Sequence, residues 1–275
     1  MAAEVRLLDD PVSALAISHE FLRERPIEHN LILTLLEQRI ADPTPGRYWI
    51  VSEGDQVIGV VFQSPLDFLA TLTPMSDAAI RAAVEAIANA KITLPGVTGE
   101  VGTAARFAGH WTEVTKSAAT PQQGQRIYEL RSLQLPEVNA GMLRPANGDD
   151  IDLLARWTSD FQSEGMPSIT SHVLAARVEA GQFWLWHLDQ PVSMAAYSTV
   201  TEGVARVAAV YTPPELRQRG FASACVGQLS AHLVSEGHRC MLYTDLGNPI
   251  SNSIYRRLGY EAVSEVLRYS FAIGT

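Results

Sequence analysis

The chain alternates between short apolar runs and longer amphipathic segments, a pattern that predicts strands and helices in turn. Residues 48–62 and residues 183–197 each hold two apolar runs on either side of a polar Asp-Gln pair, which is typical of a β-hairpin. Further along each half, a strand-like run ends in Thr-Pro before a helical segment, at residues 77–90 and 220–236. This shared order predicts an α/β protein of two similar halves, with helices covering the sheets.

A break between the halves is expected in the segment Leu135–Gly141, where Pro136 and a terminal glycine interrupt both helix and strand. We therefore expect a first domain at residues 1–138 and a second at residues 139–275. A second Pro/Gln/Gly-rich stretch, Thr120–Gln125, predicts a turn just before a strand.

Composition and charge narrow the class of protein. The 275 residues are 47% hydrophobic and 19% charged, which suits a globular protein with sizeable cores. The net charge of −9 disfavours a nucleic-acid-binding protein, which is usually basic. No apolar run reaches membrane-spanning length, and the N-terminus does not resemble a signal peptide. We expect a cytoplasmic protein that binds neither nucleic acid nor membrane.

Cysteine and histidine, the residue types that most often bind metals or form disulfides, show no characteristic spacing in this chain. The two cysteines, Cys225 and Cys240, are too far apart for a Cys-x-x-Cys motif, and we expect both to be buried free thiols. The seven histidines form no His-x-x-x-His pair, and His187 in an apolar strand has no second ligand nearby in sequence. The sequence therefore predicts no metal site.

The most distinctive segment follows the strand-like run at residues 205–211. A Thr212-Pro213-Pro214 turn leads into a basic stretch that contains Gly220 and opens a helix. Backbone N–H groups at a helix N-terminus are unpaired and carry the positive end of the helix dipole, so a phosphate can bind to them. Gly220 leaves the backbone accessible, and Arg217 and Arg219 add positive charge. This segment predicts an anion-binding site.

The same residues resemble a known signature. Arg217-x-x-Gly220-x-Ala222 is similar to the Arg/Gln-x-x-Gly-x-Gly/Ala motif of the GCN5-related N-acetyltransferase (GNAT) superfamily. One helix and one strand later, Asn248–Tyr260 resembles the second half of that signature, with a short helix and a Leu-Gly-aromatic ending. The resemblance covers residues 142–271 well and the first half only in layout. It implies two tandem GNAT-like domains, each with a central mixed, mostly antiparallel sheet flanked by helices.

The resemblance implies that acetyl-CoA is the co-substrate. In the family, the backbone of the strand before the anion-binding segment pairs with the pantetheine arm of CoA, and the amides at the start of the helix hold the pyrophosphate. The matching positions are Ala209, Val210, Tyr211 and Thr212 for the arm, and Arg217, Gln218, Arg219, Gly220, Phe221, Ala222 and Ser223 for the pyrophosphate.

Two residues of the second motif have roles implied by the family. Tyr255 matches the general acid that protonates the departing CoA thiolate; the alternative is a core tyrosine that packs its helix on the sheet. Asn252, one turn earlier on the same helix face, would hold the CoA arm or an ordered water; the alternative is an amide on the helix surface.

The base that takes a proton from the acceptor amine is less well defined. Glu164 is the first candidate, because it follows a helix in the region that borders the acceptor site in the family, although it could equally be a solvated carboxylate at the end of that helix. Glu202 in a hairpin turn and Asp245 at the end of a strand are further carboxylates, and a base acting through water is also compatible with the sequence.

The first half lacks a segment equivalent to this anion-binding site. After Thr73-Pro74, the segment Met75–Arg81 contains no glycine and no Arg-x-x-Gly-x-Ala motif. The first half is therefore expected to be a degenerate copy, and the second half to bind the cofactor.

Together these features predict an N-acyltransferase that moves an acetyl group from acetyl-CoA to the amine of a small molecule or peptide, by direct attack in a ternary complex. The alternatives are an acyl-CoA-binding regulatory module without catalysis and a tandem-domain transferase that uses another acyl donor. The sequence leaves open whether the protein forms a homodimer.

Overall fold

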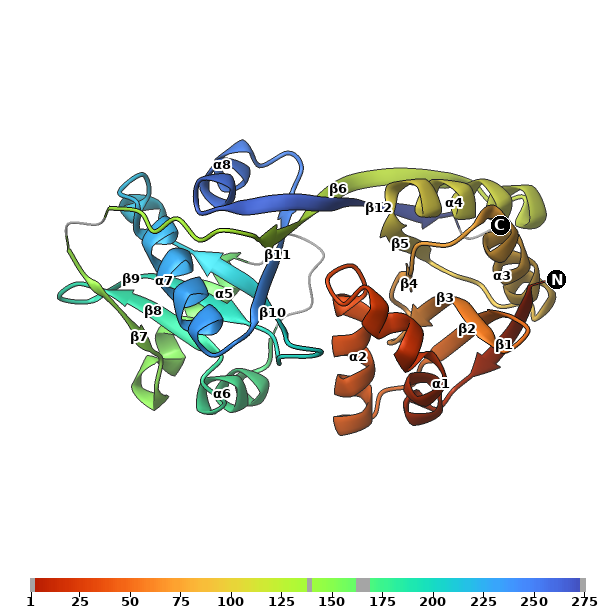
Figure 1. Cartoon of the computed structure of the whole chain (residues 1–275), viewed down its shortest axis with the longest axis horizontal. Coiled ribbons are helices and arrows are strands. Elements are labelled where there is room, and N and C mark those ends of the chain that lie inside the picture. Colours follow the sequence, from red (N-terminus) through yellow and green to blue (C-terminus); the bar gives the residue numbers. More distant parts are fainter. Residues whose placement is uncertain (1–2, 138–139, 162–168, 273–275) are drawn as a thin grey trace. The chain divides into compact units, whose positions relative to one another are not determined.

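A computed structural model provides the structure of the protein and describes residues 3–137, 140–161 and 169–272. Figure 1 follows the chain by colour from the N-terminus to the C-terminus. The elements of the first half are, in order, β1 (Glu4–Leu8), α1 (Pro11–Glu24), α2 (Asn30–Ala41), β2 (Arg47–Glu53), β3 (Gln56–Gln63), β4 (Ala70–Leu72), α3 (Asp77–Asn89), β5 (Gly96–Glu100), α4 (Val101–Thr115) and β6 (Ala119–Leu130).

The second half continues with the same kinds of element. They are β7 (Met142–Pro145), a 3-10 turn at Gly148–Asp150, α5 (Ile151–Phe161), α6 (Ser171–Glu179), β8 (Phe183–His187), β9 (Pro191–Tyr197), β10 (Val204–Tyr211), a 3-10 turn at Pro214–Leu216, α7 (Phe221–Ser235), β11 (Arg239–Asp245), α8 (Pro249–Arg257) and β12 (Tyr260–Phe271).

The two halves repeat one order of elements and one pattern of strand pairing. Apart from the short 3-10 turns, each reads strand, two helices, three strands, helix, strand, helix, strand. In the first half β1, β2, β3 and β4 pair antiparallel in sequence, and β4 then pairs parallel with β5. In the second half β7, β8, β9 and β10 pair antiparallel in the same way, and β10 pairs parallel with β11. The predicted α/β class with mixed, mostly antiparallel sheets flanked by helices is confirmed.

By their internal contacts the residues form two compact units. Unit 1 comprises residues 1–127, 244–248 and 263–275, and unit 2 comprises residues 128–243 and 249–262. The second part of β12 is in unit 1, where Val266–Ser270 pair antiparallel with β5. This division follows packing in space, whereas the boundary expected after residue 138 follows the chain, and that boundary stays a prediction.

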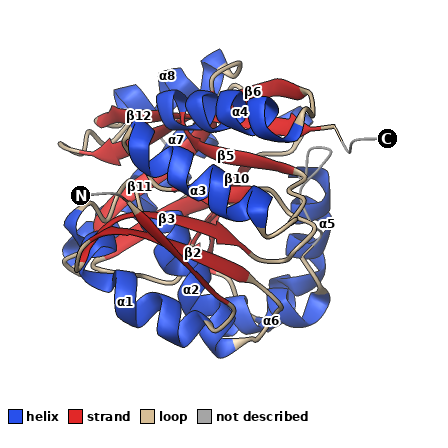
Figure 2. Cartoon of the chain, turned by 90° about the vertical axis from the view of Figure 1, so that its right-hand side faces the viewer, coloured by secondary structure: helices blue, strands red, loops and turns tan. Residues whose placement is uncertain are grey.

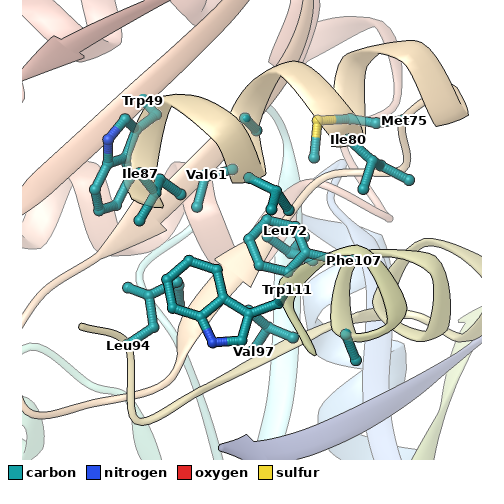
Figure 3. Packing of buried hydrophobic residues seen from close by; sticks show 14 of the residues in the cluster. Trp49, Val61, Leu72, Met75, Ile80, Ile87, Leu94, Val97, Phe107 and Trp111 are labelled. Carbon is teal, nitrogen blue, oxygen red and sulfur yellow. The ribbon is translucent and has the colours of Figure 1, made fainter. Parts of the chain in front are cut away.

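Unit 1 has helices on both faces of its strands (Figure 2). Successive side chains of a strand point to opposite faces, so β2 supplies both sides. Tyr48 and Ile50 pack in a buried cluster with residues of α1 and α2. Trp49 and Val51 pack in a second cluster with α3 and α4, which Figure 3 shows around Trp49, Phe107 and Trp111. This is why β2 is apolar on both faces.

Unit 2 is built in the same way. Residues of α7 and α8 pack in one buried cluster with Ala205 and Val207 of β10. Residues of α5 and α6 pack in another cluster with Met194 and Ala196 of β9. Tyr211 of β10 belongs to this second cluster, so β10 lies between two helical layers, and its C-terminal end carries the segment that the sequence singled out.

One expected turn is absent. Thr120–Gln125, expected as a turn, lies inside the continuous strand β6. The pairing of this long strand overrides the local turn preference of Pro121 and Gly124. None of the helices among the described residues is long and apolar enough to cross a membrane.

Candidate active site

A bulge near the end of β10 opens the sheet of unit 2. The parallel pairing of β10 with β11 runs from Val204 opposite Arg239 to Val207 opposite Leu242 and ends there. On the other side, the register with β9 shifts between Ala208 and Tyr211. Within this bulge Ala209 has a φ of 49°, which is rare for a residue with a side chain. The backbone of Ala209 and Val210 is therefore turned out of the regular ladder.

The residues after the bulge are held by side chains of the neighbouring elements. Ser193 of β9 donates a hydrogen bond from its Oγ to the carbonyl oxygen of Tyr211 (3.0 Å), and its Oγ lies 2.9 Å from the Oγ1 of Thr212. Of the four positions matched to the pantetheine arm, Ala209 and Val210 lie in the bulge, while Tyr211 and Thr212 are buried and already bonded to Ser193.

The start of α7 has the features of an anion site. Gly220 precedes the helix with a φ of 82°, and no side chain caps the helix there. The first hydrogen bond inside the helix runs from the amide of Ala224 to the carbonyl of Gly220 (3.0 Å). The amides of residues 220–223 thus have no partner inside the helix, and its first turn carries no acidic residue. Positive potential from the helix dipole is left uncompensated at this point.

The two arginines before α7 differ in their contacts. Arg217 donates from Nε to the carbonyl oxygen of Thr212 (3.0 Å), and its guanidinium carbon lies 5.9 Å from the centre of the Tyr211 ring. It therefore fixes the loop between β10 and α7, and its terminal nitrogens make no hydrogen bond to the described residues. Arg219 is exposed next to Gly220. Gln218, between the arginines, has a φ of 63° and sets the loop's sharp turn.

The helix α8 carries the two residues of the second motif on one face. Tyr255 is 7% exposed and packs against the rings of Tyr128 (6.4 Å between centres) and Tyr260 (6.1 Å). Burial raises the pKa of Tyr255 to about 12, so its hydroxyl stays protonated at neutral pH. Among the described residues none hydrogen-bonds to that hydroxyl, which leaves its proton available to a ligand.

Asn252 is buried, with its Oδ1 accepting a hydrogen bond of 3.0 Å from the hydroxyl of Tyr128 on β6. The alternative of a surface amide is therefore wrong for Asn252. Its side chain ties α8 to β6 and so helps to set the position of Tyr255, one turn later. Tyr128 was not anticipated, because nothing in the strand at residues 126–132 distinguishes it from a core tyrosine.

A carboxylate that the sequence analysis did not single out, Asp160, lies at the end of β10. Glu164, the first candidate for the base, lies outside the described residues. Asp160, on the last turn of α5, accepts a hydrogen bond of 3.2 Å from the hydroxyl of Tyr211. Burial, followed by the charge of Asp160, raises the pKa of Tyr211. Asp160 itself is exposed, so its carboxylate is open to a cation from solvent.

The two other carboxylates lie elsewhere in the fold. Glu202 is in the turn that precedes β10, with a φ of 49°, at the opposite end of that strand from the bulge. Asp245 is the exposed last residue of β11. No group of three or more His, Cys, Asp or Glu side chains that could hold a metal occurs in the part of the chain that the structure describes. Cys225 and Cys240 are buried free thiols, as predicted.

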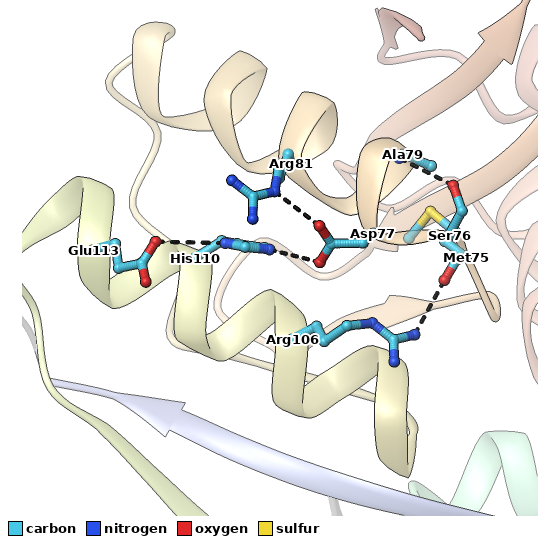
Figure 4. Close-up of polar contacts among 8 residues, drawn as sticks. All are labelled: Met75, Ser76, Asp77, Ala79, Arg81, Arg106, His110 and Glu113. Atoms are coloured by element: carbon cyan, nitrogen blue, oxygen red, sulfur yellow. Dashed lines mark hydrogen bonds and ion pairs between the residues drawn. The ribbon is translucent and has the colours of Figure 1, made fainter.

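The start of α3 is the equivalent position in unit 1, and it is closed. Ser76 caps the helix by accepting a hydrogen bond from the amide of Ala79 (3.3 Å). Asp77 follows in the first turn and is bonded to His110 (2.9 Å) and Arg81 (2.8 Å), as Figure 4 shows. Hydrogen bonds from His110 and Arg81 lower the pKa of Asp77 to about 2. A negative charge thus occupies the place that an anion would need.

Comparisons with known proteins agree with this fold. Residues 187–269 match the family model described as FR47-like protein. Among solved structures, an acetyltransferase of the GNAT family from Colwellia psychrerythraea is 10% identical, with 98% of this chain and 100% of that chain covered and a TM-score of 0.65. A GCN5-related N-acetyltransferase from Sphaerobacter thermophilus is 14% identical, with 96% and 94% covered and a TM-score of 0.63. The chain has the GNAT fold.

A third structure with this GNAT fold is a tandem GNAT protein from the clavulanic acid biosynthesis pathway, which is 12% identical, with 99% of this chain and 100% of that chain covered and a TM-score of 0.57. No curated protein matches the chain. At such low identities the likeness shows the fold alone, so activity has to be argued from the residues of the site.

Proposed function

We propose that the protein is an N-acetyltransferase that transfers an acetyl group from acetyl-CoA to a primary amine. The observation that carries this proposal is the uncapped start of α7, which directly follows the bulged end of β10. A phosphate-binding helix start next to exposed strand backbone suits a ligand with a pyrophosphate and a peptide-like arm. We also propose that the two units are tandem copies, of which only the second kept this arrangement.

In the proposed reaction the pyrophosphate binds the amides of residues 220–223, and the terminal nitrogens of Arg217 and the charge of Arg219 add to it. The acetyl thioester lies at the bulge, where a backbone N–H near Val210 stabilises the oxyanion. The amine nitrogen attacks the carbonyl carbon, and the bond from carbon to sulfur breaks. Both substrates are held together, so no acyl-enzyme is needed.

Protons move at two places in this scheme. Tyr255 donates its hydroxyl proton to the departing CoA thiolate, since its raised pKa keeps that proton in place at neutral pH. Asp160 attracts the ammonium of the acceptor and takes its proton directly or through water, because it is the exposed carboxylate bonded to Tyr211 at the end of β10. The nitrogen of the ammonium loses two protons in all: the one taken by Asp160 leaves to solvent, and the one lost as the amide forms restores Tyr255 through water, so protons and charges balance over one turnover.

Tyr255→Phe tests the proposed acid. We expect turnover of acetyl transfer to fall roughly a hundredfold, because a positioned acid contributes about that much, while the Kd for CoA stays nearly unchanged. Tyr269→Phe, on β12 in unit 1, is the control for loss of a phenol hydroxyl. Unchanged turnover in the Tyr255 variant would show that it is a packing residue. CoA binding without transfer to any amine would favour a regulatory module instead.

Asp160→Asn tests the acceptor side. Loss of the negative charge should raise the KM for cationic amines about tenfold and leave the Kd for CoA unchanged. Tyr211→Phe is the matched variant, since it removes the hydrogen bond to Asp160 but keeps the carboxylate, and we expect a smaller effect from it. Equal KM values in the Asn variant and the wild type would contradict a role for Asp160.

A further inference from the structure

Unit 1 contains an open pocket that plays no part in the proposed acetyl transfer. Its volume is about 510 Å³, which is within the range of roughly 300–1,000 Å³ typical of small-molecule sites. The side chains that matter for its chemistry are those of Glu53, Ile58, Met75, Glu100, Thr103 and Arg106.

The pocket lies where α/β sheets commonly bind ligands. β4 and β5 run parallel, with Ala70 opposite Val97 and Thr71 opposite Thr98. Met75 follows the C-terminal end of β4, Glu100 ends β5, and α4 starts directly after it. The carboxyl ends of the strands are where ligands of α/β sheets commonly bind.

The pocket has an apolar part formed by Ile58 and Met75. Met75 is only 7% exposed and packs closely over Gly59, where an added Cβ would come within 2.2 Å of its sulfur. Gly59 therefore makes the space that Met75 occupies. A methionine side chain is flexible and polarizable, and it adapts to apolar ligands of different shapes.

The charged groups around the pocket are not equally available. Glu100 caps α4, with its carboxylate accepting hydrogen bonds from the amides of Gly102 and Thr103 (both 2.8 Å) and from the Thr103 hydroxyl (2.9 Å). Burial would raise the pKa of Glu100, but these hydrogen bonds, together with the charge of Arg106, bring it below its usual range. The carboxylate of Glu100 is thus already hydrogen-bonded within the chain and is less available to a ligand. The side chain of Glu53 has no hydrogen bond or ion pair to any of the described residues.

Arg106 is the positively charged residue of the pocket lining. It donates one hydrogen bond, from Nη2 to the carbonyl oxygen of Met75 (3.3 Å), which Figure 4 shows. Its side chain is exposed, so its other N–H groups remain open to a ligand. The pocket therefore offers one available negative charge, one guanidinium fixed by a backbone carbonyl, and an apolar surface.

We propose that this pocket binds a free amino acid with an apolar side chain. Its ammonium would pair with Glu53, its carboxylate with Arg106, and its side chain would lie against Ile58 and Met75. A polyanion such as CoA is disfavoured, because Glu53 and Glu100 are both acidic and the adjacent start of α3 is closed by Ser76 and Asp77.

Leucine and three analogues test the three contacts separately. Leucinamide lacks the carboxylate, 4-methylpentanoate lacks the ammonium, and alanine lacks most of the side chain. The probes are titrated into the full chain labelled at the methionine methyl groups, with Met75 assigned by Met75→Leu. We expect leucine to shift the Met75 signal at millimolar concentration and each analogue to bind at least about threefold more weakly.

Two variants and two matched controls locate the charges. Glu53→Gln and Arg106→Gln should each weaken leucine binding about threefold to tenfold, because one ion pair in a half-open site is lost. Glu20→Gln and Arg23→Gln, exposed on α1 of the same unit, change the net charge equally and should leave the affinity unchanged.

Several results would overturn the proposal. The first is that leucine causes no shift of the Met75 signal. The second is that leucinamide or 4-methylpentanoate binds as tightly as leucine. The third is that CoA shifts the Met75 signal. Because the readout is binding in unit 1, it does not depend on acetyl transfer. Thermal unfolding of each variant shows whether a loss of binding comes instead from a loss of folding.

Discussion

The starts of α3 and α7 occupy equivalent places in two units with the same order of elements, yet their residues differ in capping and charge. At α3, Ser76 caps the helix and Asp77 neutralises its dipole, with Arg81 and His110 holding the carboxylate. At α7, the helix begins after Gly220 with no side-chain cap and no acidic residue. One start stabilises its helix from within the chain, and the other leaves amides for a ligand.

This difference teaches that binding capacity at a helix start is gained by leaving out stabilising residues. A serine or aspartate cap contributes about 1 kcal/mol to a helix, and α7 does without it. An anion bound to the same amides would replace that contribution. Under the proposed function, the fold alone does not determine which unit binds CoA. The residues at the start of α3 and of α7 determine it.

Introducing an acid at the start of α7 should have the largest effect. Ala222→Asp places a carboxylate in the first turn, where it should weaken CoA binding by about 2 kcal/mol, or roughly thirtyfold, through charge repulsion. The same change should raise the stability of the helix by about 0.5 kcal/mol, because it complements the dipole. Calorimetric titration and thermal unfolding measure the two effects.

Ala222→Asn is the control for this substitution, since it has the size of Asp without the charge. We expect it to bind CoA within about threefold of the wild type. If Asp and Asn weaken binding equally, size rather than charge decides, and the contrast between α3 and α7 loses its electrostatic basis.

Removing Arg217 should have an intermediate effect. Arg217→Ala takes away both a positive charge and the hydrogen bond to the carbonyl of Thr212, so we expect the Kd for CoA to rise about tenfold. Arg217→Lys keeps the charge without the Nε contact, so its Kd for CoA should lie between those of the wild type and the alanine variant. An unchanged Kd in the alanine variant would mean that the loop holds its shape without this arginine.

Asp77→Asn should have the smallest effect on binding, namely none, and a pH-dependent effect on stability. The folded pKa of Asp77 is lowered to about 2, below its unfolded value of about 4. Its stabilising contribution is therefore fully present above about pH 4 and is lost as the pH falls through about 2. The wild type should unfold at higher denaturant than the variant at pH 7, and the two should converge near pH 2.

A constant difference between the two proteins down to pH 2 would contradict this assignment of the Asp77 charge. A gain of CoA binding in the Asn variant would show instead that the charge alone closes α3, which would weaken the case for the Ser76 cap.

Most of the fold follows from local patterns. The hairpins β2–β3 and β8–β9 were predictable because each pairs two apolar runs across a turn of two or three residues. The long strand β6 was not, because its pairing partners are far away in sequence, and Pro121 and Gly124 within it resemble a turn when only neighbours are considered.

The candidate site was predictable to the extent that it depends on contiguous residues. The positive φ of Gly220 and the free start of α7 follow from the motif, and so does the shared face of Asn252 and Tyr255. The bonds from Tyr128 to Asn252 and from Tyr211 to Asp160 join residues 124 and 51 positions apart, so no spacing in the sequence could indicate them.

The most direct test of the central claim is to follow the backbone amide signals of the full chain while CoA is added. We predict that the largest shifts fall on Gly220, Phe221, Ala222 and Ser223, and that the amides of residues 77–80 at the start of α3 do not move. Shifts at the start of α3, or none at residues 220–223, would contradict the claim that only the second helix start binds the cofactor.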